Sequence, residues 1–271
     1  MTTAQAVALA LVQALTEFLP VSSSGHLVLM PRLLGWSDQG LEFDIATNTG
    51  TLLAVVAYFR ADLARLARGV AASVHDRDAG AAEARLAWAL ALGTVPAALA
   101  GLLVKDWVAT AARGWRLIAV NAVVYGLLLL AADLLGRKRR GLDELGRREG
   151  VLVGLAQTLA LVPGTSRSGV TMTAALALGY TREAAARFSF LLAVPIGVLV
   201  GGKQLVDLAR GVPLGVEPAA LAVGIAVSAL AGYGVIALLL GWVRRHSLAV
   251  FAVYRLALAA ALFAYFSPSG G

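Results

Sequence analysis

Six long apolar runs dominate this sequence, and they lie at approximately 45–60, 86–104, 115–136, 188–206, 217–241 and 247–266. Each is long enough to cross the roughly 30 Å of hydrocarbon in a bilayer as a helix, with the first at the short end of the required length. Only 14% of the residues are charged, whereas about 25% is usual in a soluble domain. The sequence therefore predicts an all-α integral membrane protein with six spanning helices.

Composition and charge exclude several other classes of protein. The 23 Lys and Arg and 16 Asp and Glu residues cannot cover the surface of a soluble protein of 271 residues. The absence of cysteine excludes disulfide scaffolds and thiolate metal sites. The net charge of +7 is concentrated in short segments between apolar runs, which is typical of membrane loops and not of nucleic-acid binding. The predicted partners include a membrane and no nucleic acid.

Two further apolar stretches, 4–34 and 151–179, are interrupted near the middle. The interruptions are PVSSSGH at 20–26 and PGTSRSG at 163–169, each combining proline, glycine and hydroxylated residues. Each stretch is predicted to form two half-helices. Non-helical backbone at membrane depth is tolerated only where it is buried in protein or lines a wet cavity, so both breaks are expected to face a polar pocket.

The two broken stretches resemble each other at an offset of 144 residues. Gln13 lies twelve residues before Gly25, and Gln157 lies twelve residues before Gly169. A proline and a serine-containing turn separate the members of each pair. This spacing indicates a weak internal repeat.

The repeat predicts how the single membrane domain, 1–271, is organised. If each broken stretch is a re-entrant hairpin, each half contains one hairpin and three transmembrane helices. The halves are then 1–136 and 151–266. Three spans per half invert the second half relative to the first, an architecture known from transporters.

Basic residues near the ends of the predicted spans are unevenly distributed between the two sides of the membrane. The fifteen on one side are Arg60, Arg65, Arg68, Arg77, Arg85, Arg137, Lys138, Arg139, Arg140, Arg147, Arg148, Arg182, Arg187, Arg244 and Arg245. The six on the other are Arg32, Lys105, Arg113, Arg116, Lys203 and Arg210. Because cytoplasmic loops carry the excess, loops 61–85, 137–150 and 242–246 are predicted in the cytoplasm and both termini outside.

The first break carries residues suited to nucleophilic and acid–base chemistry. Gln13 and Glu17 are four residues apart and share a helix face, a spacing at which both can hold a cation or a water. The hydroxyls of Ser22, Ser23 and Ser24 and the imidazole of His26 offer a nucleophile and a base. Two plainer interpretations remain: the serines can satisfy freed backbone groups, and His26 can be a hydrogen-bonded interior residue.

The second break has the features of a phosphate site. Ser166, Arg167 and Ser168 follow Gly164 and begin the next half-helix, with Thr171 one turn further on. Free N–H groups at a helix N-terminus, a guanidinium and hydroxyls all bind phosphate. The alternative is that Arg167 only pairs with Glu17 as a buried ion pair.

Other polar residues within apolar runs receive structural interpretations. Arg255, near the middle of the last predicted span, is expected to pair with an interior acid such as Asp44 or to extend its side chain to the interface. Asp44, Thr47, Asn48 and Thr49 are expected to line the pocket or to cap a helix.

Three segments resemble a known family: LVQALTEFLPVSSSGH at 11–26, PGTSRSGVT at 163–171 and FSFLLAVP at 188–195. They are similar to the undecaprenyl-diphosphate phosphatase family of the bacitracin-resistance type, and the likeness covers nearly the whole chain. The resemblance implies hydrolysis of undecaprenyl diphosphate to the monophosphate carrier lipid at the outer face of the bacterial cytoplasmic membrane. A divalent cation, Mg²⁺ or Ca²⁺, and a homodimer are further implications.

The resemblance also assigns roles to particular residues. Ser23 is the expected nucleophile, His26 the base or alternative nucleophile, and Arg167 the group that holds phosphate. Glu17 is expected to be a metal ligand or orienting acid, with Gln13 as the second metal ligand. The expected substrate-binding residues are Ser22, Ser24, Gly25, Gly164, Ser166, Ser168 and Thr171.

Two positions depart from the family pattern. Gln13 replaces a glutamate found in many members, which weakens the case for a metal site with two carboxylates. Asn48-Thr49 stands where the family more often has His or Gln followed by Leu. A second function, transport of an anionic lipid by a transporter or flippase, also fits the predicted architecture. The presence of nucleophile, imidazole and acid within ten residues favours the enzyme, because transport requires binding and gating but no serine activated beside a histidine.

Overall fold

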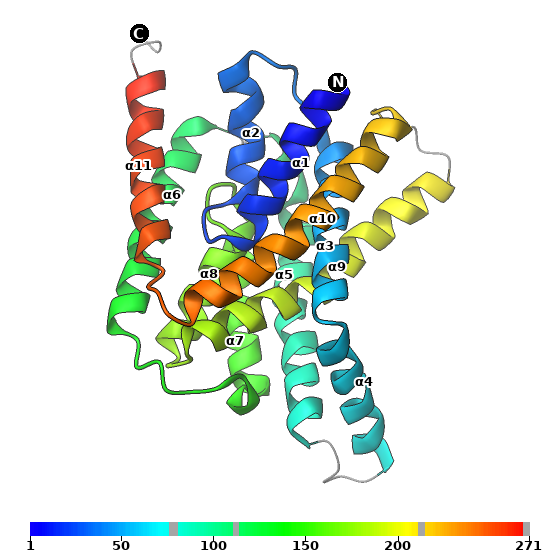
Figure 1. The fold of residues 1–271 in the computed structure, drawn as a ribbon, viewed down its shortest axis with the longest axis vertical. Helices are drawn as coiled ribbons and strands as arrows, with labels where there is room; N and C mark the ends of the chain where they lie inside the picture. The colour runs from blue at the N-terminus through cyan, green and yellow to red at the C-terminus, as the bar shows by residue number, and fades with distance from the viewer. Residues whose placement is uncertain (76–80, 111–113, 211–214, 268–271) are drawn as a thin grey trace.

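The computed structural model describes residues 1–75, 81–110, 114–210 and 215–267, and this part of the chain is almost entirely helical (Figure 1). Its α-helices are α1 Thr3–Phe18, α2 Ser23–Leu34, α3 Leu41–Tyr58, α4 Arg60–His75, α5 Ala81–Thr110, α6 Trp115–Leu135, α7 Arg147–Thr158, α8 Arg167–Ala177, α9 Arg182–Ala209, α10 Pro218–Val243 and α11 Ala249–Phe266. Two short 3₁₀ helices, η2 Leu142–Glu144 and η3 Leu159–Leu161, precede and follow α7.

Five helices within the described ranges are long and apolar enough to cross a membrane. The candidate spans are Ala82–Val104, Trp115–Leu135, Arg182–Gln204, Pro218–Val243 and Ala249–Phe266. They confirm an all-α, multi-pass membrane protein and correspond to five of the six predicted spans. The sixth, at 45–60, is part of α3, which does not reach the same apolar length. Glu42, Asp44 and Asn48 lower the hydropathy of that helix.

Both interrupted stretches form two helices each, as predicted: α1 and α2 in the first, α7 and α8 in the second. Ser22 and Ser166 precede α2 and α8 with φ values of 77° and 76°, a region that residues other than glycine rarely adopt. Their hydroxyls accept the backbone N–H groups of Gly25 and Gly169 at 3.4 and 3.1 Å. The two turns, 144 residues apart, therefore share one backbone conformation and one capping hydrogen bond.

Segment 61–85 is not the loop that the sequence predicts. Residues 60–75 form α4, which packs against the start of α5. Leu66 is buried in a hydrophobic cluster with Leu86 and Leu90 of α5. Apolar residues at helical spacing gave the segment a buried face, and its high arginine content concealed that pattern. Arg77 and Arg113, which contributed to the charge count, lie outside the described residues.

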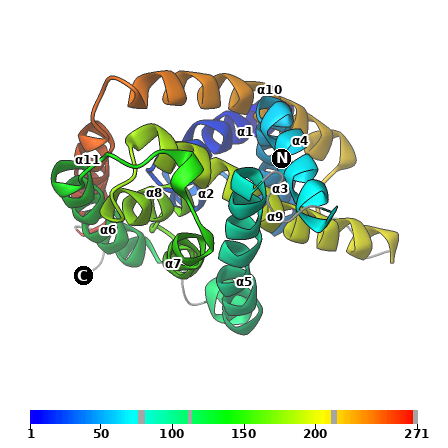
Figure 2. The same ribbon diagram turned by 90° about the horizontal axis from the view of Figure 1, so that it is seen from below.

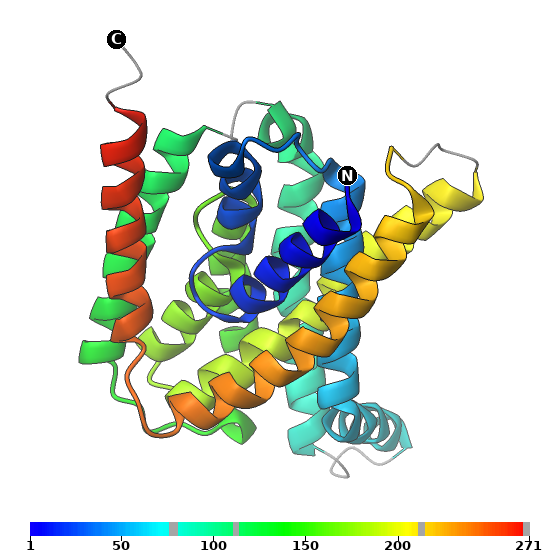
Figure 3. The same cartoon turned by 45° about the horizontal axis from the view of Figure 1, so that its top comes forward.

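The interrupted helices occupy the middle of the molecule, and longer helices surround them (Figures 1 and 2). Helix α10 packs along α3 and α1, while α6 and α11 pair on the opposite side (Figure 3). The start of α1 and the end of α11 lie toward one end of the molecule, and α4 lies toward the other. At the centre, the Phe18 ring meets Phe190 edge to face at 5.3 Å between centroids. This packing holds the end of α1, and hence the first break, against α9.

Candidate active site

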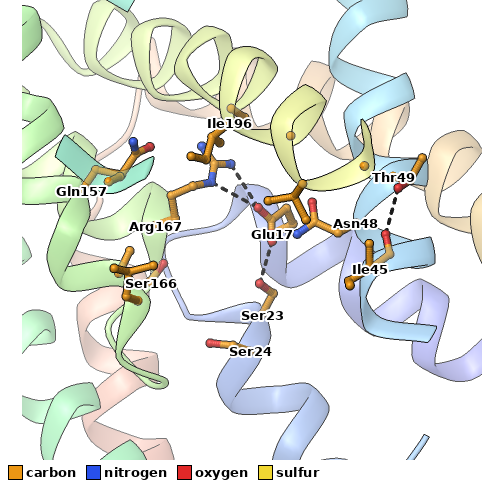
Figure 4. Close-up of a pocket in the computed structure, with 17 residues that line it drawn as sticks. Glu17, Ser23, Ser24, Ile45, Asn48, Thr49, Gln157, Ser166, Arg167 and Ile196 are labelled. Atoms are coloured by element: carbon orange, nitrogen blue, oxygen red, sulfur yellow. Dashed lines mark hydrogen bonds and ion pairs between the residues drawn. The ribbon is translucent and has the colours of Figure 1, made fainter. Parts of the chain in front are cut away.

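A cavity of about 230 Å³ lies where the two breaks meet (Figure 4). Its polar lining consists of Glu17, Ser23, Ser24, Asn48, Thr49, Gln157, Ser166 and Arg167. Apolar and small residues complete the wall: Ile45, Ala97, Ala160, Leu161, Ala193, Ile196, Gly197, Val200 and Gly201. The predicted polar pocket is therefore present. One part of its wall is polar, and the part formed by α5 and α9 is apolar.

Glu17 connects the two breaks at the centre of this cavity. Its Oε1 accepts hydrogen bonds from Nη2 and Nε of Arg167 at 3.1 and 3.3 Å. Its Oε2 accepts the Ser23 hydroxyl at 2.6 Å and the Gln13 amide at 3.2 Å. Only 10% of the Glu17 side chain is exposed, so this carboxylate is largely removed from water and depends on its four donors.

Arg167 is the first residue of α8, and its side chain crosses to the first break. Besides the two bonds to Glu17, Nη1 donates to the carbonyl oxygen of Ser189 at 2.9 Å. These contacts use three of the five guanidinium N–H groups. Two N–H groups remain without a partner in the described part of the chain. Arg167 therefore pairs with Glu17, as the plainer interpretation proposed, and still retains donors for an anion.

The Ser23 hydroxyl and the Glu17 carboxylate are in hydrogen-bond contact, the arrangement that a nucleophile and its general base require. A hydroxyl that donates to a carboxylate at 2.6 Å is positioned to transfer its proton when the oxygen attacks. Ser23 begins α2, and Glu17 lies in the last turn of α1, so the turn between these helices sets the distance.

His26 is not in this pair. Its Nδ1 is bonded to the Ser22 carbonyl at 2.7 Å and its Nε2 to the Tyr254 hydroxyl at 2.6 Å. The imidazole is stacked on the Tyr254 ring, with centroids 5.8 Å apart, and it does not line the cavity. The described contacts include no hydrogen bond between Ser23 and His26, the residue that the resemblance offered as its base. The reason is tertiary: α11 brings Tyr254 to the far face of α2 and engages the ring there.

The predicted substrate-binding serines differ in position and in the contacts that they make. Ser24 and Ser166 line the cavity. Ser22 and Ser166 cap helices, so Ser166 has both roles. Ser168 donates to the Leu19 carbonyl at 3.0 Å, which fastens the second break to the first.

Thr171, Gly25 and Gly164 lie behind the cavity lining. The Thr171 hydroxyl donates to the Ser189 hydroxyl at 2.7 Å. A Cβ on Gly164 would lie 2.8 Å from the backbone of Ile118, and one on Gly25 would lie 3.2 Å from the Ile118 side chain. These three residues therefore support packing at the crossing of the breaks with α6 and α9.

Arg255 makes a set of hydrogen bonds that the sequence did not predict. The side chain is fully buried in α11. Its guanidinium donates, at 2.8 to 3.3 Å, to the carbonyl oxygens of Pro20, Asn121, Ala122, Gly164 and Thr165. The proposed pairing with Asp44 is wrong, because Arg255 binds backbone carbonyls and Asp44 accepts from Gln39 at 2.6 Å. Arg255 thus ties both breaks to α6.

The polar segment at the start of α3 contributes two residues to the cavity. Asn48 and Thr49 line it, as one of the two interpretations predicted. Thr47 is buried and donates to the Phe43 carbonyl at 3.1 Å within its own helix. The departure from the family pattern at 48–49 therefore lies in the cavity wall.

The residues present do not form a metal centre by themselves. Within the described ranges, no group of three or more His, Cys, Asp and Glu side chains is close enough to hold an ion. Glu17 is the one carboxylate in the lining, and both of its oxygens accept hydrogen bonds from protein donors. The Gln13 amide nitrogen points toward that carboxylate and acts as a donor. This donor-rich setting fits an anion better than a cation.

Sequence analysis did not single out Gln157, which lines the cavity, as a candidate site residue, nor Tyr254, which contacts the predicted site residue His26. Tyr254 gave no local signal, because it lies among apolar residues of the last helix. Gln157 served only to mark the internal repeat, yet it is buried in the cavity wall. Its position in the internal repeat, equivalent to that of Gln13, was the sequence signal that could have identified it as a site residue.

Fold and site together define an all-α, multi-pass membrane protein with a cavity at the meeting point of two broken helices, whose polar lining includes the guanidinium of Arg167 and several hydroxyl and amide groups. Comparison with known families matches residues 6–261 to the family described as "Bacitracin resistance protein BacA". The chain belongs to this family, and the resemblance inferred from its motifs is confirmed.

Three relatives align with this chain over almost their full length. A protein of Magnetococcus marinus named "Undecaprenyl-diphosphatase" is 51% identical over 96% of this chain and 97% of its own. One of Nitrosococcus oceani with the same name is 49% identical, covering 96% and 98%. "Undecaprenyl-diphosphatase 2" of Stutzerimonas stutzeri is 47% identical, covering 97% and 98%.

Replacing Arg255 with leucine should destabilise the protein strongly. Several buried carbonyls of the breaks would lose a charged donor, and we expect the free energy of unfolding to fall by about 3 kcal/mol or more. Thermal unfolding of the detergent-purified protein measures this. Arg116→Leu, at an exposed position of α6, is the matched control. Equal melting temperatures for the two variants would contradict the role of Arg255.

Proposed function

We propose that this protein is an integral membrane phosphatase that hydrolyses undecaprenyl diphosphate to undecaprenyl phosphate and inorganic phosphate. The relatives carry that activity in their names, and the cavity contains the groups it requires. The observation that carries the proposal is the Ser23 hydroxyl at 2.6 Å from Glu17, whose other oxygen is paired with Arg167. In the cell this reaction recycles the carrier lipid of cell-wall synthesis and confers resistance to bacitracin.

The chemistry follows from the positions of Ser23 and Glu17. Ser23 Oγ attacks the terminal phosphorus while its proton passes to Glu17, and the bond to the bridging oxygen breaks. The bonding electrons leave with undecaprenyl phosphate, which takes the proton from Glu17, and phosphoserine remains. Water then attacks this phosphorus, Glu17 accepts a proton from the water, and Ser23 recovers a proton as inorganic phosphate leaves.

Arg167 supports both steps by binding the phosphoryl oxygens. Stabilising charge on these oxygens is most of the catalytic task in phosphoryl transfer. The guanidinium binds the Glu17 oxygen that does not accept from Ser23, and its two remaining N–H groups are available to the transferred group. The free N–H groups in the first turn of α8 add to this positive potential.

The apolar wall explains how a long isoprenoid reaches the site. Ala97 of α5 and Ala193, Ile196 and Val200 of α9 line the same cavity as the polar groups. A lipid chain can remain among apolar surfaces while its diphosphate enters the polar part.

Ser23→Ala should reduce phosphate release by about 100-fold or more, because the attacking oxygen is lost. Ser24→Ala should reduce it much less, since Ser24 lines the cavity without contacting Glu17 in the described hydrogen bonds. The assay is inorganic phosphate release from a polyprenyl diphosphate by purified protein in detergent. Equal losses in both variants would contradict the assignment of the nucleophile. No release by the wild type would contradict the enzyme and favour a transporter.

We propose further that any divalent cation, Mg²⁺ or Ca²⁺, enters with the substrate. The lining offers a single carboxylate, so the diphosphate oxygens supply most of the ligands that such a cation requires. Isothermal titration of Mg²⁺ into the protein without lipid should therefore give millimolar or weaker binding. Tight binding that Glu17→Gln abolishes would show a metal site built by the protein.

Sidedness and internal symmetry complete the proposal. We propose an inverted repeat of 1–136 and 151–266 with two re-entrant hairpins, embedded in the cytoplasmic membrane with its cavity open to the outer face. The matching turns at Ser22 and Ser166 support the repeat. The excess of basic residues supports a cytoplasmic location for α4 and for the segment 137–150.

Single cysteines test this orientation, because the native chain has none. In intact cells, Ser37→Cys and Ser267→Cys should react with a membrane-impermeant thiol reagent, whereas Asp143→Cys should react only after lysis. All three positions are exposed, and Asp143→Cys removes no basic residue. Labelling of Asp143→Cys from outside, with protection of the other two, would reverse the topology.

A further inference from the structure

Gln157 is a buried amide whose polar atoms have no partner. Only 3% of the residue is exposed, and it lines the cavity. Neither its Nε2 nor its Oε1 makes a hydrogen bond within the described residues. Leaving a buried amide unpaired is destabilising, and most such groups in folded proteins have a partner. A buried, unpaired amide in a cavity wall indicates that a bound ligand supplies its hydrogen-bond partners.

The internal repeat explains why this amide is unpaired. Gln13, 144 residues earlier, is also buried and donates to Glu17 four residues further along its helix. Four residues after Gln157 the chain has Leu161, which also lines the cavity. The second half therefore retains the glutamine and lacks the carboxylate that would engage it.

The surroundings of Gln157 favour an anion. Figure 4 shows Arg167 between Gln157 and Glu17, so the amide lies on the side of the guanidinium away from the carboxylate. No acidic residue other than Glu17 is present in the lining, and Ser166 adds a hydroxyl on the same side. An amide offers two N–H donors to phosphate oxygens. Its carbonyl can accept a hydrogen bond from a water or from a protonated phosphate oxygen.

We propose that Gln157 is a substrate-binding residue that recognises the second phosphate of the diphosphate, the one that stays on the lipid. This inference rests on the proposed phosphatase function. The terminal phosphorus must lie beside Ser23, on the Glu17 side of Arg167. The lipid-linked phosphate then extends past the guanidinium toward Gln157 and the apolar wall. Gln157 thereby favours a diphosphate over a monophosphate, which has no group to reach it.

The test compares Gln157→Leu and Gln157→Met with Gln204→Leu. Gln204 is a partly buried glutamine that donates to the Glu42 carbonyl and does not line the cavity, so it controls for loss of an amide. We expect kcat/KM for a polyprenyl diphosphate to fall about 10-fold to 100-fold in both Gln157 variants, mainly through KM. Gln204→Leu should change kcat/KM less than threefold.

Two further measurements separate ligand binding from a structural role. A non-hydrolysable farnesyl methylenediphosphonate should inhibit the wild type more strongly than farnesyl phosphonate, and the Gln157 variants should lose most of that difference. Because an unpaired buried amide contributes nothing to folding, the melting temperature of the free variants should equal or exceed that of the wild type.

The outcomes distinguish failure of this inference from failure of the phosphatase itself. Unchanged kcat/KM and unchanged inhibitor preference in Gln157→Leu and Gln157→Met would overturn the role of Gln157. Lower melting temperatures with unchanged preference would also overturn it and make Gln157 structural. If the wild type releases no phosphate, the proposed function fails, and the diphosphonate preference measured by binding still decides whether Gln157 recognises the second phosphate.

Discussion

The structure depends on satisfying the backbone of two broken helices inside a membrane protein. Freed carbonyl and amide groups in such surroundings need partners, because water is scarce there. Arg255 supplies donors to carbonyls of both breaks and of α6 from one guanidinium. Ser22 and Ser166 accept amide N–H groups at the start of the following helices. Because these backbone groups are hydrogen-bonded, the two breaks can place Ser23 and Arg167 in one cavity.

The ion pair of Glu17 and Arg167 is the second element on which the site depends. A largely buried pair contributes little net stability, because removing both charges from water offsets their attraction. The main effect of the pair is to fix positions. It joins the end of α1 to the start of α8 and holds the carboxylate beside the Ser23 hydroxyl. The opposite charges of the pair also leave the cavity lining close to neutral, while the guanidinium retains N–H groups for phosphate.

The two halves of the cavity differ in chemistry although their turns share one conformation. The first half places a carboxylate, a hydroxyl and a paired glutamine together. The second half places a guanidinium where the first has Ser23, and a leucine where the first has Glu17. The two halves thus differ at two equivalent positions, Glu17 and Leu161 in one case and Ser23 and Arg167 in the other. In the proposed reaction the first half supplies the nucleophile and base, and the second half supplies the group that binds the anion.

The sequence by itself determined the membrane class, the positions of both breaks and four of the polar residues that meet in the cavity, namely Glu17, Ser23, Ser166 and Arg167. These follow from local properties: the length of the apolar runs, the proline and glycine residues that interrupt them, and the charged residues within them, which are costly to place in lipid. The helix at α4 was missed because its arginines obscured a weak apolar face. Only the tertiary structure decided the partners of His26 and Arg255, and only it left Gln157 unpaired among the described residues. Which groups these side chains meet depends on distant helices that lie against them, since α11 brings Tyr254 to His26 across 228 residues of chain.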